Sequence, residues 1–168
     1  HPNRAKMASI VCEILPFNKD GNLKFLDLGV GTGYLSRRII EAFPHATIVA
    51  IDAAELMIEK AQIRLQDHLK QVTFKLSTFQ ELPDKEKTLS NLDGVVSSFA
   101  LHHLYREEKL ILFKYIRSIL KPNGWFINCD IFKTDDAVLE ARFRYLHHLG
   151  IQQRIKRIKD IEKPLDQI

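Results

Sequence analysis

Three glycines at alternate positions form the pattern with the clearest chemical meaning in this chain. Gly29, Gly31 and Gly33 follow a short apolar run and precede an amphipathic stretch. Glycine permits positive φ angles and lets a ligand approach the backbone closely. A helix that starts after the loop would direct free N–H groups and a partial positive charge at that ligand. A tight strand-to-helix turn that binds nothing has the same pattern, so the glycines alone do not decide between the two.

Asp52 is the second candidate, because it ends a β-branched run about 20 residues beyond the glycines. A carboxylate at this place can accept hydrogen bonds from both hydroxyls of a ribose. The alternative is an N-cap for a helix that starts at Ala53 or Ala54. In combination with the glycine loop, the binding role is favoured.

The spacing of the glycines indicates which ligand the loop would hold. Dinucleotide-binding loops read GxGxxG, whereas this loop reads GxGxG and Tyr34 stands in the place of the last glycine. A bulky aromatic side chain there would obstruct the packing around a pyrophosphate. The pattern therefore favours a nucleoside without phosphates, and an NAD-type oxidoreductase is the rival prediction.

Short apolar runs alternate with amphipathic stretches along the chain, and these elements must position the glycines and Asp52. Strands are expected at residues 24–28, 47–51, 72–76, 94–98 and 125–131, and helices at 4–15, 34–43, 54–69, 107–120 and from 135 onward with a break at Gly150. The core-facing positions are Leu35, Ile39 and Phe43 in one helix and Leu56, Ala61 and Leu65 in the next. Strand and helix in alternation predict an α/β fold with a doubly wound, mostly parallel sheet, whose ligands bind beyond the carboxyl ends of the strands.

The composition is that of a folded globular protein, with 45% hydrophobic and 27% charged residues and a net charge of +4. Lys and Arg are scattered except near residues 154–159, so the charge pattern argues against a nucleic-acid partner. No run of 18 apolar residues exists, and we expect no membrane span. Cys12 and Cys129 are far apart in the sequence, which predicts reduced, partly buried thiols and a cytoplasmic protein.

A family resemblance becomes clear when five segments are taken in order. Residues 25–33 read FLDLGVGTG, which resembles the first motif of class I S-adenosylmethionine-dependent methyltransferases. Four further segments resemble this family. They are residues 48–52, which are followed in the sequence by Met57 and Ala61, and residues 79–83, 92–104 and 119–125. Together they cover residues 24–130 at the usual spacings. The resemblance implies a Rossmann-like core with strand order 3-2-1-4-5 and S-adenosylmethionine as cofactor.

The resemblance also implies roles for individual residues. Gly29, Gly31 and Gly33 would let the methionine moiety and ribose approach the backbone, and Asp52 would bind the ribose hydroxyls. The other implied cofactor-binding residues are Asp27 at the amino group, Ala53 and Met57 on the adenine, Thr78 and Phe79 at the adenine edge, and Ser97 beneath the methionine part. For Met57 the alternative is ordinary helix core. The family often has an acid where Thr78 stands, which predicts weaker binding there.

His102 and His103 are the candidates for catalysis, because they follow the fourth predicted strand, near the expected methyl position. A sulfonium methyl is already reactive, so a base is needed only if the acceptor carries a proton. The alternative for His103 is to cap or pack the following helix. An Asn/Asp-Pro-Pro-Tyr motif is absent after this strand, which favours a small-molecule acceptor over base or amide nitrogens. A non-catalytic cofactor-binding or assembly module is the second rival.

The end of the chain gives the remaining expectations. We expect one domain over residues 1–168, with an N-terminal helix in 1–20, the cofactor-binding core in 24–131 and a helical segment in 135–168. The family fold continues with a further helix and an antiparallel strand pair, so we expect a longer natural protein. Without that pair the fifth strand keeps an exposed edge through which the chain could associate. The pairs 102–103 and 147–148 lack zinc-like spacing, and no metal is predicted. The last helix would cover the substrate mouth or, alternatively, bind a membrane surface.

Overall fold

The computed structural model describes residues 4–131 and 134–161 of the chain. Contacts between residues divide the chain into two compact units, of which Lys6–Ile131 contains the sheet. The other unit contains the long helix α6 (Ala137–Ile161) and is described by itself. The single domain expected over residues 1–168 stays a prediction.

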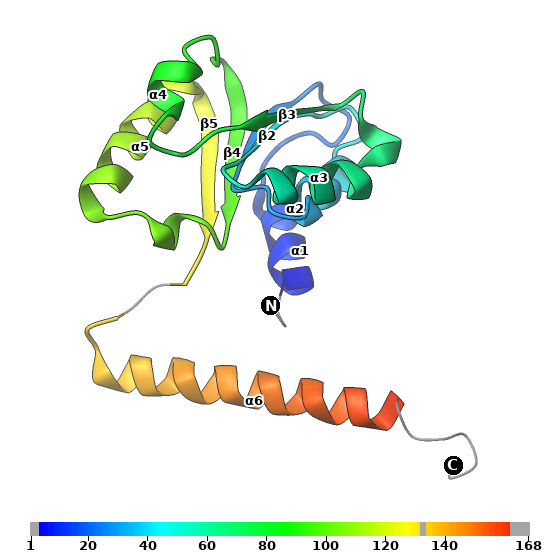
Figure 1. The fold of residues 1–168 in the computed structure, drawn as a ribbon, viewed down its shortest axis with the longest axis vertical. Coiled ribbons are helices and arrows are strands. Elements are labelled where there is room, and N and C mark those ends of the chain that lie inside the picture. The colour runs from blue at the N-terminus through cyan, green and yellow to red at the C-terminus, as the bar shows by residue number, and fades with distance from the viewer. Residues whose placement is uncertain (1–3, 132–133, 162–168) are drawn as a thin grey trace. The chain divides into compact units, whose positions relative to one another are not determined.

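The unit Lys6–Ile131 is built on a five-stranded sheet in the order β3-β2-β1-β4-β5 (Figure 1). The strands are β1 (Lys24–Leu28), β2 (Thr47–Asp52), β3 (Val72–Leu76), β4 (Leu92–Ser98) and β5 (Leu120–Cys129). Every neighbouring pair is parallel. The predicted α/β class, the doubly wound parallel sheet and the strand order are confirmed.

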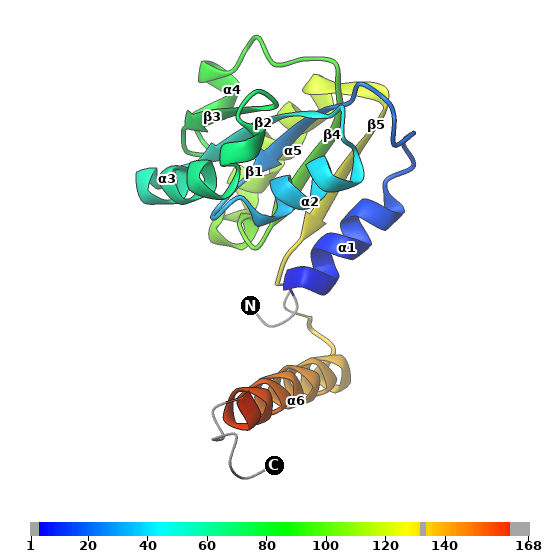
Figure 2. The same cartoon turned by 90° about the vertical axis from the view of Figure 1, so that its right-hand side faces the viewer.

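Helices cover both faces of this sheet. The helices α1 (Arg4–Ile14), α2 (Tyr34–Ala42) and α3 (Glu55–Arg64) lie on one face, and α4 (Leu82–Lys85) and α5 (Arg106–Ile119) lie on the other (Figures 1 and 2). Two separate apolar clusters fill the two interfaces. Buried apolar residues on both sides of the sheet are what parallel strands require. The carboxyl ends of all five strands therefore share one edge, where the loops after them meet.

One predicted core position is wrong. Leu35, Ile39, Phe43, Ala61 and Leu65 are buried as expected. Leu56 is 55% exposed. It lies five residues before Ala61, so at 3.6 residues per turn it projects from a different side of α3 than Ala61 and Leu65.

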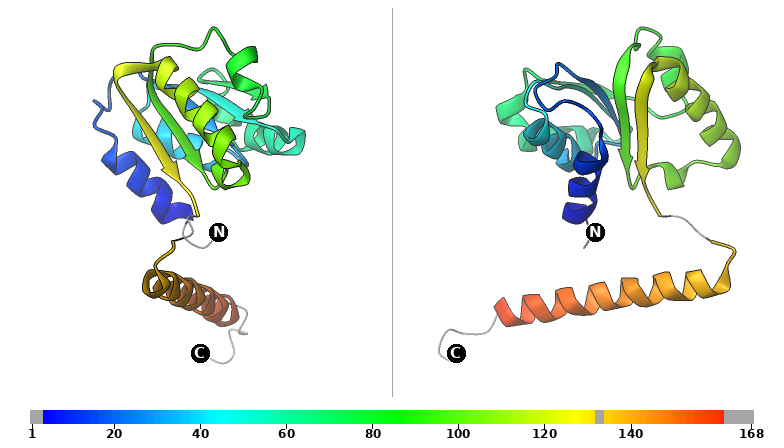
Figure 3. Two further views of the ribbon diagram at one scale, coloured as in Figure 1. Left: turned by 90° about the vertical axis from the view of Figure 1, so that its left-hand side faces the viewer. Right: turned by 180° about the vertical axis from the view of Figure 1, so that it is seen from behind.

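Several predicted boundaries also differ. The fourth strand begins at Leu92 instead of residue 94, and the helix predicted over 54–69 ends at Arg64. The fifth strand already begins at Leu120 and ends at Cys129, because residues 121–124 stay in the sheet as an irregularity between the pairs Leu92–Leu120 and Gly94–Trp125. Helix α6 runs without a break through Gly150 (Figure 3). A glycine in a helix interior costs only about 1 kcal/mol, which the flanking helix-forming residues offset.

The two cysteines are free and half-buried. Burial raises the pKa of both thiols, and for Cys129 the nearby Asp130 carboxylate adds to the rise. Among the helices in residues 4–131 and 134–161, the structure contains none that combines the length and apolarity of a membrane span.

Candidate functional site

The glycine loop lies between β1 and α2 and is folded back onto the end of β2. Gly29, Gly31 and Gly33 have φ angles of 75°, 52° and 73°. The backbone N–H groups of Gly29 and Val30 both donate to the Ile51 carbonyl at 2.9 Å. Positive φ at three alternate positions is available to glycine alone at no steric cost, so these residues fix the shape of the loop.

Asp52 fastens this loop to the end of β2. Its Oδ2 accepts from the Gly31 N–H at 2.8 Å, and its Oδ1 accepts from the Ala54 N–H at 3.0 Å. The second bond satisfies a backbone N–H at the start of α3. Asp52 therefore also performs part of the capping role that was the alternative to ligand binding. A carboxylate has about four acceptor positions, and these two bonds leave one on each oxygen. The half-exposed Asp52 can therefore still accept from two vicinal hydroxyls.

Two of the glycines are also required by packing, which the sequence did not indicate. A Cβ on Gly29 would lie 2.3 Å from the Ala100 Cβ and 3.5 Å from the Phe79 ring. A Cβ on Gly33 would lie 3.2 Å from the Cβ of Ala61 on α3. The loop is thus in contact with three other elements of the same edge.

Asp27 and Ser97 lie beneath the loop. The Asp27 side chain is buried and accepts from the Ser36 hydroxyl on α2 at 2.6 Å. The Ser97 hydroxyl is fully buried and donates to the Leu28 carbonyl at 2.8 Å. The Ser97 side chain therefore supports the backbone directly before Gly29, and the Asp27 side chain joins β1 to α2. Their predicted contacts with a methionine moiety stay predictions.

The residues after β2 and β3 line the same edge. Ala53 is exposed and Met57 is half-buried on the first turn of α3. Phe79 is half-buried with its ring beside Gly29. The structure thus brings the loop after β3 to the glycine loop, as the proposed adenine contacts need.

The Glu81 side chain brings a carboxylate next to Thr78, the position at which the resemblance led us to expect an acid. Its Oε2 accepts from both the N–H and the hydroxyl of Thr78 at 3.0 Å, and its Oε1 pairs with Lys85 at 2.7 Å. The hydrogen bond from Lys85, followed by those from Thr78, lowers the pKa of Glu81 to about 2. Sequence reasoning missed this contact because the acid stands three residues after Thr78.

Arg64 closes the loop from the far end of α3, and it too was missed. Its Nε donates to the Thr32 carbonyl at 2.7 Å, and its guanidinium carbon lies 5.7 Å from the centroid of the Tyr34 ring. A cation over an aromatic face is attractive. Tyr34 at the last-glycine position is thus part of a contact that holds the loop.

The ends of β4 and β5 bring His102 to Asp130. His102 lies on a short 3₁₀ helix, Leu101–His103, directly after β4. Its Nδ1 is 2.6 Å from Asp130 Oδ1, and its backbone N–H donates to Asp130 Oδ2 at 2.9 Å. Because the predicted fifth strand extended to 131, Asp130 was taken as a strand residue. In the structure it is the first residue after β5, where functional residues of parallel sheets are expected.

His103 has a different environment from His102. Its ring lies against that of His102, with centroids 4.0 Å apart. The N-cap of α5 is Tyr105, so His103 does not cap that helix. The two candidate bases are therefore distinguished by the aspartate that only His102 contacts.

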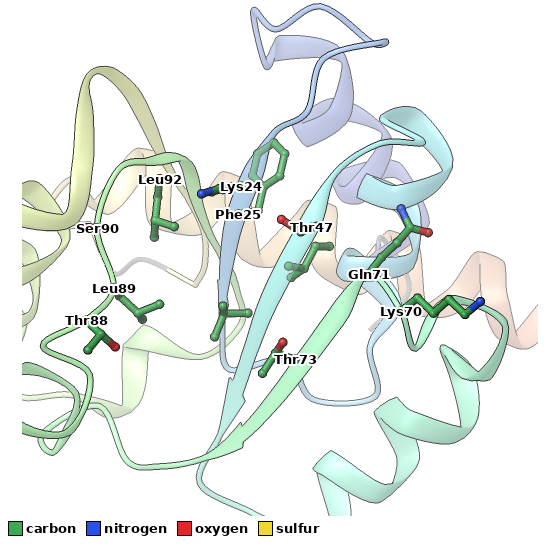
Figure 4. A pocket seen from close by; sticks show the side chains of 12 residues that line it. Lys24, Phe25, Thr47, Lys70, Gln71, Thr73, Thr88, Leu89, Ser90 and Leu92 are labelled. Atoms are coloured by element: carbon green, nitrogen blue, oxygen red, sulfur yellow. The ribbon is translucent and has the colours of Figure 1, made fainter.

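One cavity of this unit lies away from the glycine loop. It has a volume of about 280 Å³ and lies at the amino ends of β1–β3, between the sheet and residues 88–92 (Figure 4). A smaller one, of about 70 Å³, lies beside Phe79 and is lined also by Leu104 and Ile111. Within the described residues, no group of three or more His, Cys, Asp or Glu side chains could hold a metal ion.

The sequence is similar to those of several methyltransferases. A malonyl-[acyl-carrier protein] O-methyltransferase of Halalkalibacterium halodurans is 31% identical over 106 residues, which cover 63% of this chain and 38% of that protein. An uncharacterized methyltransferase of Oceanobacillus iheyensis is 32% identical over 130 residues, which cover 76% of this chain and 55% of that protein. The chain thus spans about half or less of the length of these relatives.

The fold is that of known methyltransferase structures. The crystal structure of a SAM-dependent methyltransferase from Aquifex aeolicus matches with a TM-score of 0.62 at 20% identity, covering 82% of this chain and 72% of that one. At this identity the likeness shows the fold alone. A family model described as a methyltransferase domain matches residues 25–124, which is more than half of the chain. The chain therefore belongs to the methyltransferase-domain family, and its resemblance to the class I S-adenosylmethionine-dependent methyltransferases is confirmed.

Proposed function

We propose that this protein transfers a methyl group from S-adenosylmethionine to a small-molecule acceptor. The observation that carries the proposal is the Asp52 carboxylate, held against the glycine loop by two backbone N–H groups with one acceptor position left on each oxygen. Vicinal ribose hydroxyls are the natural partners of such a carboxylate.

The residues at this edge fit an adenosine group without phosphates. Asp52 would bind the ribose, Phe79 and Met57 would pack on the adenine, and Thr78 with Glu81 would face its polar edge. The glycine loop and the buried residues beneath it would hold the methionine part, near Asp27 and Ser97. The bound cofactor would supply a methyl group on a good leaving group. The protein would supply position and the exclusion of water.

The rival dinucleotide is disfavoured by the contact that holds the loop. The Tyr34 ring occupies the start of α2 and is covered by the Arg64 guanidinium. In dinucleotide-binding loops a small residue at this position lets the helix pack closely against the strand around the pyrophosphate. The amino acid type and its partner therefore both favour the sulfonium nucleoside over NAD.

Calorimetric titration with S-adenosylhomocysteine, S-adenosylmethionine and NAD tests the cofactor assignment. We expect binding of the first two and none of NAD. The variant Asp52→Ala removes hydrogen bonds to a charged group, and we expect about 100-fold weaker binding of S-adenosylhomocysteine. Asp67→Ala, an exposed aspartate on the 3₁₀ helix Gln66–His68, is the matched control and should bind as the wild type does. Unchanged affinity in Asp52→Ala would contradict the proposal.

Turnover distinguishes the enzyme from a module that only binds the cofactor. The full natural chain is incubated with labelled S-adenosylmethionine and a panel of small acceptors. Transfer of label supports the enzyme, whereas binding without transfer to any acceptor supports the non-catalytic alternative. A cytoplasmic location and self-association through β5 are part of the same proposal, and fractionation and sedimentation test them.

A further inference from the structure

A histidine–aspartate pair joins the two strand ends that lie beyond the proposed cofactor contacts. His102 follows β4 and Asp130 follows β5, and the two residues share two hydrogen bonds, at 2.6 Å and 2.9 Å. The first joins the imidazole Nδ1 to Asp130 Oδ1, and the second joins the His102 backbone N–H to Asp130 Oδ2. One carboxylate therefore holds both the ring and the backbone of the same residue.

The carboxylate is fixed on its own side as well. Asp130 Oδ1 also accepts from the Ile131 N–H at 2.8 Å, and only 2% of the Asp130 side chain is exposed. An ionised carboxylate can only accept, so a neutral His102 ring must carry its proton on Nδ1. The lone pair then lies on Nε2, and 32% of the His102 side chain is exposed. The carboxylate thus fixes the neutral ring in one defined tautomer, with its proton acceptor at Nε2.

The turn that carries His102 is held in an uncommon conformation. Phe99 has a φ of 55°, which is rare for an aromatic residue, and its backbone N–H donates to the Cys129 carbonyl at 2.9 Å. On either side of the histidine pair, Leu101 and Leu104 are buried against the sheet. Such conformations persist where the surrounding structure imposes them, and they cluster at functional sites. His102 is thus placed by the fold and not by a free loop.

We propose that Asp130 is a positioning residue that prepares His102 as a general base, and that the methyl acceptor is therefore a hydroxyl group of an alcohol or a phenol. This inference rests on the proposed methyl transfer. The oxygen–methyl bond forms as the sulfur–methyl bond breaks, and the hydroxyl proton passes to His102 Nε2. The positive charge thus moves from the sulfonium to the imidazolium, which the Asp130 carboxylate stabilises.

A carboxylate acceptor would make no use of this pair. A relative is named as a methyltransferase of malonyl-[acyl-carrier protein] that acts on oxygen. A free carboxyl group has lost its proton at neutral pH, so its methylation needs no base. The presence of the pair therefore favours a hydroxyl acceptor over a carboxylate acceptor.

Nitrogen NMR of the imidazole rings tests the pair without any turnover. In the ¹⁵N-labelled protein we expect the His102 signals, assigned by their loss in His102→Gln, to show a protonated Nδ1 and an unprotonated Nε2. Asp130→Asn should change this tautomer pattern. Asp93→Asn is the matched control, because Asp93 is also a buried aspartate and accepts from Lys24 and Lys121; this variant should leave the tautomer pattern unchanged. A protonated Nε2 in the wild type, or no effect of Asp130→Asn, would overturn the proposal.

Two phenols of different acidity test the acceptor class in the full natural chain. para-Nitrophenol is ionised at mildly alkaline pH, whereas para-cresol keeps its proton. With para-cresol, we expect His102→Gln to lower kcat by about 100-fold or more with little change in KM, and with para-nitrophenol by less than about threefold. His45→Gln, an exposed histidine before β2, should behave as the wild type does. Equal losses with both phenols, or methylation of a malonyl thioester but of no hydroxyl acceptor, would overturn the assignment.

The test of His102 as a general base can fail or succeed independently of the test of cofactor binding. Binding of S-adenosylhomocysteine to His102→Gln and Asp130→Asn should match the wild type, because neither side chain is among the proposed cofactor contacts. Loss of cofactor binding in the wild type would refute the methyltransferase proposal and leave the NMR result standing. Normal binding with the wrong tautomer would refute only the base.

Discussion

The carboxyl ends and the amino ends of the strands form two edges of the sheet, and their polar groups differ in how fully they are hydrogen-bonded. At the carboxyl edge, Asp52 keeps an acceptor position on each oxygen, and His102 keeps Nε2. At the amino edge, the Asp93 carboxylate accepts from the Lys24 N–H at 2.9 Å and from the Lys121 ammonium at 2.6 Å. That buried aspartate joins the starts of β1 and β5 to β4 and is occupied by structural contacts.

The larger cavity lies at the amino edge, where the polar groups are exposed or already paired. Its lining includes Lys24, Thr47 and Thr73, which stand on three neighbouring strands (Figure 4). This cavity therefore lies away from the proposed cofactor contacts. The chemistry selects the edge where partly satisfied groups from several strand ends converge, which is where parallel sheets bind ligands.

The largest expected effect comes from placing a side chain on the glycine loop. Gly29→Ala adds a Cβ 2.3 Å from Ala100 at a φ of 75°. We expect a loss of about 2–5 kcal/mol in the free energy of unfolding, measured with urea. Gly94→Ala, whose Cβ would lie 2.5 Å from the Phe25 ring, should also destabilise. Only the first should weaken the binding of S-adenosylhomocysteine at temperatures where both variants are folded, and equal affinities would contradict the contrast between the edges.

A smaller effect is expected from the residue that closes the loop. Arg64→Ala removes the hydrogen bond to the Thr32 carbonyl and the contact with Tyr34. Because the side chain is exposed, we expect an affinity loss of about three- to tenfold for S-adenosylhomocysteine. Lys60→Ala, an exposed residue of the same helix, is the matched control. A full loss of binding in Arg64→Ala would show that Arg64 contacts the ligand itself.

The carboxylate beside Thr78 gives a pH-dependent signal. Its folded-state pKa of about 2 lies below the ordinary value of 4.5, so its hydrogen bonds to Thr78 persist above 4.5 and are lost as the pH falls towards 2. A ¹³C NMR titration of the Glu81 carboxyl should give a midpoint near 2. In Lys85→Met the midpoint should move back towards 4.5, since Lys85 is the largest cause. A midpoint that stays in place in this variant would assign the shift to Thr78.

The smallest effect is expected at the amino edge. Thr73→Phe places a large ring in the cavity of about 280 Å³. We expect the affinity for S-adenosylhomocysteine to stay within twofold of the wild type, as it should for a site at the opposite edge. Stability should change by about 0.5 kcal/mol or less, as is usual for exposed positions. A strong loss of affinity would move the binding site to this edge.

Local patterns in the sequence predicted most of the fold. The strands β1 and β3 have the predicted bounds, because each is an apolar run flanked by turn residues. The start of β5 could not be seen, because Lys121–Gly124 reads as a turn and only pairing with β4 keeps it in the sheet. Leu56 was misplaced because the helix was expected to bury more of its circumference than it does.

The candidate site was predictable where a motif is continuous. The glycine loop and Asp52 stand directly after their strands, so the topology alone brings them together. The contacts of Arg64 with Thr32 and of His102 with Asp130 join residues 32 and 28 positions apart. No local periodicity encodes such pairs, and for Asp130 an error of two residues in the strand boundary was enough to conceal it.

The contact between Gly29 and Ala100 has a mechanical consequence. The missing side chain of the one and the methyl group of the other fit together, so the loop that would cradle the cofactor rests on the turn that carries His102. Because Ala100 is buried against Gly29, position 100 can hold nothing much larger than alanine. Movement of either loop towards the other would force both to shift, so the nucleoside crevice and the imidazole are joined through a direct steric contact.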